Sequence, residues 1–170
     1  IDYIKSEYPD IFTIADAKRC DIENTSRRYA KAYFERLNFD SITISPYMGK
    51  DSVEPFLKYK DKHTILLALT SNSGANDFQF NQCSGKKLYQ QVIESSIKWE
   101  NSQQLMYVVG ANHTDLISSI RRIVPDNFLL IPGIGAQGGD LKQISQAAMN
   151  DKCGIIVNAS RSIIYSSNCK

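Results

Sequence analysis

The sequence lacks the features that mark several classes of protein. No apolar run approaches the roughly 20 residues that a membrane-spanning helix needs, and no signal peptide is visible, so we expect neither membrane insertion nor secretion. The net charge is only +2, which argues against a nucleic-acid binder that relies on bulk electrostatics. We also find no internal repeat, low-complexity tract or linker, so we expect one domain.

Cysteine is sparse and scattered, and histidine is rarer still. The sequence has no C-x-x-C pair, and His63 and His113 lie far from the cysteines, so a structural zinc site is not expected. Free thiols in a reducing cytoplasm are the better interpretation of Cys20, Cys83, Cys153 and Cys169. For His113, which stands at the start of a predicted helix, we expect a capping or surface role.

What the sequence does contain is an alternation of short apolar runs with longer helical patterns. Runs that are almost continuously apolar fit strands covered on both faces, and their alternation with helices predicts a parallel α/β fold. The predicted strands are residues 11–15, 41–45, 64–69, 105–109, 128–131 and 154–158. The predicted helices are residues 24–37 with Asn24 as the N-cap candidate, 51–59, 86–99, 115–122 and 140–149.

Polar or glycine-rich sequence follows nearly every predicted strand, as in DAKRCD, TSNSGAND and PGIGAQGGD. In a TIM (β/α)8 barrel the loops after the strands gather on one face, whereas an open doubly wound sheet concentrates function at one switch point. The spread of polar loops therefore favours the barrel, with six of its eight βα units visible. Residues 2–7 fit the end of a helix before the first strand. We expect a single barrel domain over residues 1–170, truncated at its N-terminus and in its last helix.

Three charged residues crowd together after the first predicted strand. They form the pattern Asp16-x-Lys18-x-x-Asp21. In an extended segment Asp16 and Lys18 point to the same side, because side chains alternate along a strand. A lysine held by carboxylates stays protonated and is well placed to donate a proton. A catalytic site is the first hypothesis for this cluster, and a surface ion pair on a solvated loop is the second.

A second cluster has the pattern of a phosphate site. Residues 133–139, GIGAQGG, satisfy G-x-G-x-x-G and follow a predicted strand, which is compatible with a dinucleotide fingerprint. The dinucleotide interpretation is weakened because Pro132 directly precedes the loop and because the loop lies late in the chain. Backbone amides in such a loop bind phosphate equally well in a barrel. Arg161, after the last predicted strand, can grip the same anion with two parallel hydrogen bonds.

These segments together resemble the orotidine 5′-phosphate decarboxylase family, especially its longer bacterial branch. The family signature D-x-K-x-x-D-I-x-x-T matches Asp16, Lys18, Asp21, Ile22 and Thr25. The resemblance covers the whole chain, through SPYMGKDSVEPFL, LLALTSNSGANDFQ, YVVGAN, IPGIGAQGGDL and IVNASRSIIY. It implies a (β/α)8 barrel that works as a homodimer without a metal or an organic cofactor. The implied reaction converts orotidine 5′-monophosphate to uridine 5′-monophosphate (UMP) and CO2, the last step of de novo pyrimidine biosynthesis.

The resemblance also implies a catalytic role for each charged residue of the signature. Lys18 protonates C6 of the pyrimidine as the carboxylate departs. Asp16 lies near the leaving carboxylate and holds Lys18. Asp21 and Thr25 reach the active site of the partner subunit, so that each site is shared.

Substrate binding is implied for four further residues. Ser71, in the polar loop TSNSGA, contacts the pyrimidine ring. Gln137 and Arg161 bind the phosphate, together with backbone amides of the Gly135 and Arg161 loops. On residue pattern alone the Ser71 loop is a weak signal, because clusters of Ser, Asn and Gly are usually plain loops.

Two departures from the family pattern keep other functions open. Cys20 and Glu23 stand where the closest branch usually has glycine, and no residue matches the family's ribose-binding Asp or its second Lys. Lys5 is not that second Lys, because it lies in the preceding helix. One alternative is a related phosphosugar barrel of the 3-keto-gulonate-phosphate decarboxylase type, which shares D-x-K-x-x-D and uses Mg²⁺. Another is an inactive remnant that binds nucleotide.

Overall fold

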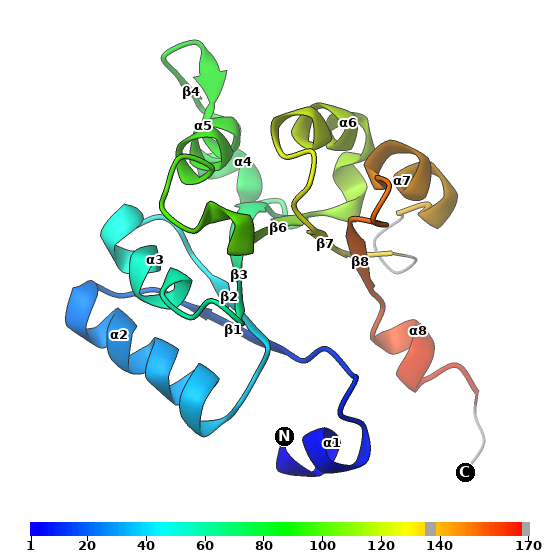
Figure 1. The fold of residues 1–170 in the computed structure, drawn as a ribbon. Coiled ribbons are helices and arrows are strands. Elements are labelled where there is room, and N and C mark those ends of the chain that lie inside the picture. Colours follow the sequence, from blue (N-terminus) through cyan, green and yellow to red (C-terminus); the bar gives the residue numbers. More distant parts are fainter. Residues whose placement is uncertain (135–138, 168–170) are drawn as a thin grey trace. The chain divides into compact units, whose positions relative to one another are not determined.

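Parallel β-strands alternate with helices along the chain (Figure 1). The computed structural model describes residues 1–134 and 139–167. The chain divides into two compact units, one made of Ile1–Leu67 with Ser95–Met106 and the other of Ala68–Glu94 with Tyr107–Lys170. The alternation of strands and helices in both units confirms the predicted α/β class.

The first unit is built on three parallel strands in the order β1-β2-β3. These strands are β1 (Ile14–Arg19), β2 (Ser41–Ile44) and β3 (His63–Leu69), and the last two residues of β3 belong to the second unit. The helices of the first unit are α1 (Asp2–Glu7), α2 (Glu23–Lys31), its π-helical continuation η1 (Ala32–Arg36), α3 (Lys50–Leu57) and the 3-10 turn η2 (Ser102–Gln104). Every residue of β2 is buried, as expected for a strand between two neighbours.

Helices α2 and α3 pack against each other through an aromatic contact and a buried hydrogen bond. Ala30 and Phe34 lie four residues apart, on one face of the continuous α2–η1 helix, and both are buried. The rings of Phe34 and Phe56 meet edge to face at 6.2 Å between centroids. The buried Ser26 hydroxyl donates to the Ser52 carbonyl oxygen at 2.8 Å. Burying an aromatic side chain such as Phe34 stabilises the fold by roughly 1.5–3 kcal/mol.

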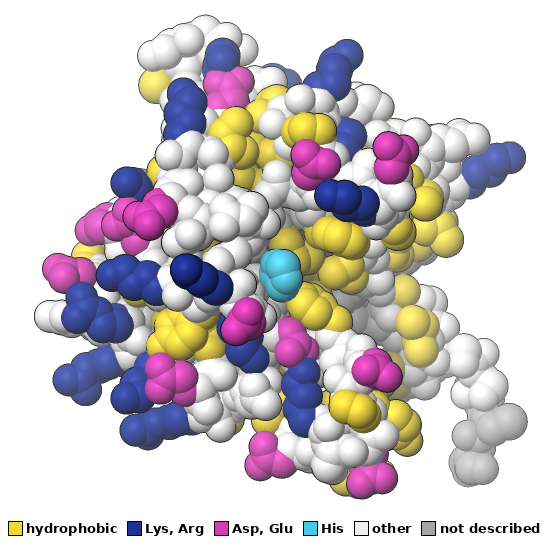
Figure 2. All heavy atoms as spheres, in the orientation of Figure 1, with side chains coloured by type: hydrophobic (Ala, Val, Ile, Leu, Met, Phe, Trp, Pro, Cys, Tyr) yellow, Lys and Arg dark blue, Asp and Glu magenta, His cyan; other side chains and the backbone are white. Residues whose placement is uncertain are grey.

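The opposite face of the α2–η1 helix is charged. In Figure 2, Lys and Arg side chains gather over this helix, with acidic side chains among them. Arg27, Arg28, Lys31, Ala32 and Arg36 line a shallow hollow of about 460 Å³. The pattern is that of an amphipathic helix with a solvated outer face.

The second unit holds the other three parallel strands, in the order β6-β7-β8. They are β6 (Leu105–Val109), β7 (Leu129–Pro132) and β8 (Ile155–Asn158). The first two residues of β6 belong to the first unit, and all of β6 is buried. The other described elements of this unit are α4 (Ala75–Phe78), the hairpin strands β4 (Gln82–Cys83) and β5 (Lys86–Lys87), α5 (Leu88–Ser96, its last two residues in the first unit), the 3-10 turn η3 (Ala111–His113), α6 (Thr114–Ile123), α7 (Leu141–Ala148) and α8 (Arg161–Ile164). The half-buried Arg121 on α6 donates to the carbonyl oxygens of Ala148 and Gly154 at 2.8 Å each, which ties α6 to the end of α7 and the start of β8.

Three predicted boundaries are wrong. The first strand starts at Ile14 rather than Ile11 and continues through the charged residues to Arg19. Ile11 and Phe12 are 51% and 42% exposed, because pairing with β2 begins only at Ile14, opposite Ser41. The following helix begins at Glu23 with Ile22 as its N-cap, so Asn24 is not the cap.

The third error concerns the helix predicted over residues 86–99. Lys86 and Lys87 instead pair with Gln82 and Cys83 in a hairpin, so α5 begins at Leu88. The turn residues Ser84 and Gly85 both have positive φ, which is the backbone of a tight hairpin turn. The Ser-Gly pair was therefore the missed signal.

Two further findings bear on the expectations from composition. No helix within the described residues is long and apolar enough to span a membrane. The three cysteines that the structure describes, Cys20, Cys83 and Cys153, are free thiols, as predicted, and Cys169 lies outside the described residues.

Candidate active site

The Asp16–Lys18 pair stands at the C-terminal end of β1, in the first unit. The Lys18 ammonium contacts Asp16 Oδ1 at 2.6 Å, so the predicted contact between the two side chains is present. Both side chains are open to solvent, with 54% of Lys18 and 64% of Asp16 exposed. The carboxylate and the ammonium are thus a preformed pair that a ligand can reach.

Thr43 on the neighbouring strand β2 connects the two members of the pair. Its hydroxyl donates to Asp16 Oδ1 at 2.9 Å and accepts from the Lys18 backbone N–H at 2.9 Å. Thr43 is 1% exposed, so its side chain is fixed by the packing around β2. A buried hydroxyl of this kind orients the groups that it bonds, because it has little freedom of its own.

The backbone around the pair is irregular. Between Ala15 and Arg19, β1 advances four residues while β2 advances two, from Ile42 to Ile44, which is a bulge. Lys18 has a φ of 47°, in the left-handed region that a lysine rarely adopts. Such a conformation costs of order 1–3 kcal/mol and is held only where the surroundings impose it. The bulge, not a regular alternation along the strand, brings Lys18 onto Asp16.

The charges at this site act on the protonation of Asp16. Partial burial by itself would raise the pKa of Asp16. The hydrogen bonds from Lys18 and Thr43, together with the charge of Lys18, outweigh burial and hold the pKa below its usual range. Asp16 is therefore a carboxylate at neutral pH.

Asp21 and Thr25 lie beyond the end of β1 and do not join the pair. The Asp21 carboxylate accepts from the backbone N–H of Ile22 at 2.8 Å, at the start of α2. Within the described residues, the Lys18 ammonium forms an ion pair with Asp16 and none with Asp21. Thr25 sits half-buried in the first turn of α2. The structure of one chain thus brings together two of the three charged residues of the signature.

Ser71 lies in the second unit, just after the end of β3. The loop there is held by hydrogen bonds from the segment that follows β6. The Asn112 side chain donates to the Ser71 carbonyl oxygen at 3.2 Å, and His113 contacts the Thr70 carbonyl oxygen at 3.0 Å. Ser71 is partly exposed. His113 therefore has a specific partner, and its side chain makes no capping hydrogen bond to α6.

The residues predicted to bind phosphate are only partly described. Gly135 and Gln137 lie outside the described residues. Arg161 is exposed, at the first position of the short helix α8. At the ends of the glycine-rich loop, Gly133 has a φ of 99° and a Cβ added to Gly139 would lie 2.5 Å from the Ala111 Cβ. Both glycines are needed for the backbone at these two places.

Residue reasoning missed Thr43, Asn112 and His113 as parts of the candidate site. A signal existed for Thr43, because it is a polar residue inside the buried strand SITI. Asn112 and His113 carried no such signal, since their partners are backbone oxygens 41 and 43 residues away. For metals, no group of three or more His, Cys, Asp or Glu side chains suited to hold an ion occurs in residues 1–134 and 139–167.

Comparison with known proteins gives consistent matches along the chain. Residues 1–170 match the model of the family described as "Orotidine 5'-phosphate decarboxylase / HUMPS family". The orotidine 5′-phosphate decarboxylase of Flavobacterium johnsoniae is 64% identical over 167 residues, covering 98% of this chain and 61% of that protein. The enzyme of the same name from Christiangramia forsetii is 60% identical and covers 99% of this chain and 62% of that protein. The chain therefore spans about three fifths of the length of these relatives.

A solved structure supports the same assignment of the fold. The OMP decarboxylase of Leishmania donovani has a TM-score of 0.82 and 38% identity, over 88% of this chain and 59% of that one. Solved structures of this kind are (β/α)8 barrels, which confirms the predicted barrel class. Within the described residues, the chain contributes six parallel strands to that fold.

Proposed function

Because the chain belongs to the orotidine 5′-phosphate decarboxylase / HUMPS family, we propose that the protein carrying it decarboxylates orotidine 5′-monophosphate. The bond between C6 and the carboxylate breaks, CO2 leaves, and the electron pair remains on C6. A proton from the Lys18 ammonium then forms the new C6–H bond and gives UMP. The observation that carries the proposal is the Asp16–Lys18 pair, held by Thr43 in a chain 64% identical to a named decarboxylase.

Lys18 has two tasks in this reaction. Its ammonium stabilises the negative charge that develops on C6, and it then supplies the proton. The bulge and the bond to Asp16 support these tasks, because a charge that is already oriented needs no reorganisation during the reaction. By family resemblance the reaction uses no metal or organic cofactor.

Asp16 acts together with Lys18, which it contacts directly. Its Oδ1 is occupied by Lys18 and Thr43, and its pKa is held below the usual range, so it stays negative beside the substrate carboxylate. Repulsion between these two carboxylates disfavours the bound substrate and is relieved as CO2 departs. The same carboxylate keeps the ammonium in place for protonation.

Binding of the nucleotide phosphate is assigned to residues of the second unit. Gln137, Arg161 and the backbone amides near Gly135 and Arg161 are its proposed ligands. A dianionic phosphate offers binding energy remote from C6, which can be used to order the site around the reacting carbon. The exposed position of Arg161 leaves its guanidinium accessible for such a bidentate contact.

Asp21 and Thr25 are assigned to the active site of a partner subunit in a homodimer. Support comes from the loops after β1 and β2, where Ile22 and Tyr47 are 61% and 81% exposed. Apolar side chains beside a functional carboxylate suit a subunit interface. The reduced cysteines motivate a cytoplasmic location for this dimer.

The shared site predicts a complementation experiment. Lys18→Ala and Asp21→Ala homodimers should each be inactive, because every site lacks one residue. Random mixing of the two should restore about one quarter of wild-type activity, since half of the dimers are mixed and each has one intact site. Mixtures that stay as inactive as either parent would contradict the assignment of Asp21 to the partner's site.

Turnover of orotidine 5′-monophosphate, followed by the change in ultraviolet absorbance, tests the reaction itself. We expect turnover that persists in EDTA. Turnover lost in EDTA would favour the Mg²⁺-dependent phosphosugar type, although the names of the 60–64% identical relatives favour the nucleotide. A protein that binds UMP without turning over the substrate would instead be the inactive remnant.

A further inference from the structure

Three consecutive carbonyl oxygens at the end of β3 are all held by one short segment after β6. The bonds run from Gly110 N to Leu69 O (2.8 Å), from His113 Nε2 to Thr70 O (3.0 Å) and from Asn112 Nδ2 to Ser71 O (3.2 Å). A carbonyl oxygen only accepts hydrogen bonds, so His113 carries a proton on Nε2 here. The backbone from Leu69 to Ser71 is therefore held by a single segment, residues 110–113.

The two segments also touch backbone to backbone. A Cβ added to Gly110 would lie 2.8 Å from both the Cα and the Cβ of Ser71, which is closer than real Cβ contacts come. Only glycine fits at this point, and the contact leaves the Ser71 backbone no room to move toward Gly110.

A second pair of hydrogen bonds holds the loop through Thr70. The Thr70 N–H donates to Gln79 Oε1 and Gln79 Nε2 donates to the Thr70 hydroxyl, each at 2.8 Å. The ring of Phe80 packs against that of His113, with 5.4 Å between centroids, and so supports His113. Thr70 is thus bonded through its N–H, its carbonyl and its side chain.

Ser71 itself keeps unused hydrogen-bonding groups. Among the residues that the structure describes, neither its hydroxyl nor its backbone N–H has a partner, whereas its carbonyl is bonded to Asn112. A residue with a fixed backbone and a free donor–acceptor pair suits recognition of the polar edge of a ring. Sites of this kind discriminate well, because a ligand without the matching groups leaves them unpaired.

We propose that Asn112 and His113 are positioning residues that hold the Ser71 hydroxyl and N–H toward the pyrimidine ring of the nucleotide. They act through the Thr70 and Ser71 carbonyl oxygens and do not touch the ligand. Their contribution is to specificity for the base, while the phosphate is bound elsewhere. This inference rests on the proposed function, because that function assigns Ser71 to the ring.

The test compares two ligands that differ in the base. Affinities for UMP and for ribose 5-phosphate are measured by calorimetry on the intact protein that carries this chain. In His113→Ala and Asn112→Ala we expect the affinity for UMP to fall about tenfold, which is about the effect of losing one hydrogen bond to the ligand. The affinity for ribose 5-phosphate should stay within about twofold of wild type. His113→Gln should restore UMP affinity, because its amide can donate to the Thr70 carbonyl. His63→Ala is the matched control and should change neither affinity.

Several results would overturn the inference. Equal losses for UMP and ribose 5-phosphate would mean that the residues only support the fold, and unchanged UMP affinity in both alanine variants would mean that they do not position Ser71. If His113→Ala does not fold, His113→Gln decides, and a tenfold loss there despite a native circular dichroism spectrum would contradict the proposed bond. A wild-type protein that binds UMP but shows no turnover would refute the proposed function and leave this inference standing, because the test measures ligand affinity and not turnover.

Discussion

The first unit contains two Lys–Asp pairs at opposite ends of the same two strands. Lys5 and Asp40 meet at 2.5 Å just before β1 and β2 begin, whereas Lys18 and Asp16 meet at 2.6 Å where β1 ends. The first pair is largely buried, with 20% and 24% of the side chains exposed, and the second is open, with 54% and 64% exposed. The two pairs have similar geometry and different surroundings.

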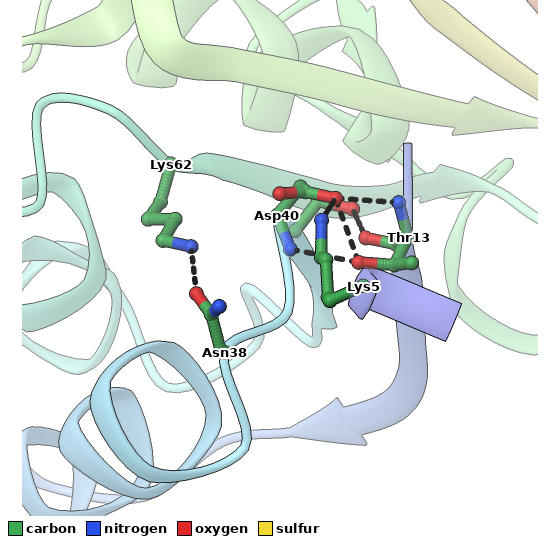
Figure 3. A network of polar contacts seen from close by, with 6 residues as sticks. Lys5, Thr13, Asn38, Asp40 and Lys62 are labelled. Atoms are coloured by element: carbon green, nitrogen blue, oxygen red, sulfur yellow. Dashed lines mark hydrogen bonds and ion pairs between the residues drawn. The ribbon is translucent and has the colours of Figure 1, made fainter. Parts of the chain in front are cut away.

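The Lys5–Asp40 pair is a structural junction (Figure 3). Asp40 Oδ2 accepts from the Lys5 ammonium and from both the N–H and the hydroxyl of Thr13, at 2.7 Å each for Thr13. These bonds join α1, the residue before β1 and the residue before β2. In barrels, the N-terminal ends of strands serve stability and the C-terminal ends carry the chemistry. Two ion pairs with nearly the same N–O distance therefore differ in role because they lie at different ends of the strands and on different backbones.

The backbone shows the same difference. Thr13 and Asp40 precede regular pairing that begins at Ile14 and Ser41, whereas Lys18 has a left-handed φ inside a bulge. The strained backbone conformation of Lys18 lies at the C-terminal end of β1, whereas the residues that begin the pairing, Ile14 and Ser41, have no positive φ. Strained residues that persist in a fold are characteristic of functional sites.

The largest expected effect follows from removing the ammonium at the open end. Lys18→Ala should lower the rate of the proposed decarboxylation by about 10³-fold or more, because the proposed proton donor and the charge proposed to stabilise C6 are both lost. The fold should be kept, since Lys18 is exposed. Steady-state turnover and circular dichroism measure the two quantities. Lys62→Ala, which removes an ammonium that donates to the Asn38 side chain, is the control and should turn over normally.

Removing the Asp40 carboxylate should lower stability and leave turnover unchanged, the reverse of the effect expected for Lys18→Ala. Asp40→Ala leaves the Thr13 N–H, the Thr13 hydroxyl and the Lys5 ammonium without their acceptor. We expect the free energy of unfolding to fall by about 2–3 kcal/mol in chemical denaturation. The turnover of the folded protein should stay near wild type, and Asp61→Ala, an exposed aspartate, should be neutral. A stable but inactive Asp40→Ala would assign this end a chemical role instead.

A smaller effect is expected from the hydroxyl that links the open pair. Thr43→Val keeps the shape of the side chain and removes its bonds to Asp16 and to the Lys18 N–H. We expect kcat to fall about tenfold with little change in KM, because orientation is lost and binding is not. Thr43→Ser, which keeps a hydroxyl, should recover most of the rate. A rise in KM with kcat unchanged would place Thr43 in binding.

The smallest effect concerns pH. Burial alone would raise the pKa of Asp40, but the hydrogen bonds from Lys5 and Thr13 outweigh it and lower the pKa in the folded protein. Asp40 therefore contributes stability that is fully present above about pH 4 and is lost as the pH falls further. Asp40→Asn should make the acid limb of the stability curve less steep in denaturation at pH 2 to 6. An unchanged acid limb would mean that Asp40 titrates alike in the folded and unfolded protein.

The sequence predicted most of the fold because the signals were local. Five of the six strands lie within two residues of their predicted bounds, since runs such as LMYVV are apolar throughout. The first strand was misplaced because its C-terminal half carries Asp16, Lys18 and Arg19, which periodicity treats as a loop. Local rules are expected to fail at functional sites, and the end of β1 is the candidate for one.

The contact between the charged residues of the candidate site could be predicted from the sequence, but the backbone and the hydrogen bonds that support the site could not. The signature identified Asp16 and Lys18 and their contact, but not the bulge or the left-handed Lys18 that produce it. The hydrogen bonds of Asn112 and His113 join segments about 40 residues apart, and no spacing rule reaches that far. The roles of all the site residues stay predictions, as does the single domain over residues 1–170, and Gly135 and Gln137 lie outside the described residues.

The most direct test of the contrast between the two pairs is a side-by-side measurement of Lys18→Ala and Lys5→Ala. For each variant, kcat for orotidine 5′-monophosphate and the free energy of unfolding are determined on the same preparation. The account predicts that Lys18→Ala loses turnover and keeps stability, while Lys5→Ala loses stability and keeps the turnover of its folded fraction. It would be contradicted if Lys18→Ala retained turnover, or if both variants lost the same quantity.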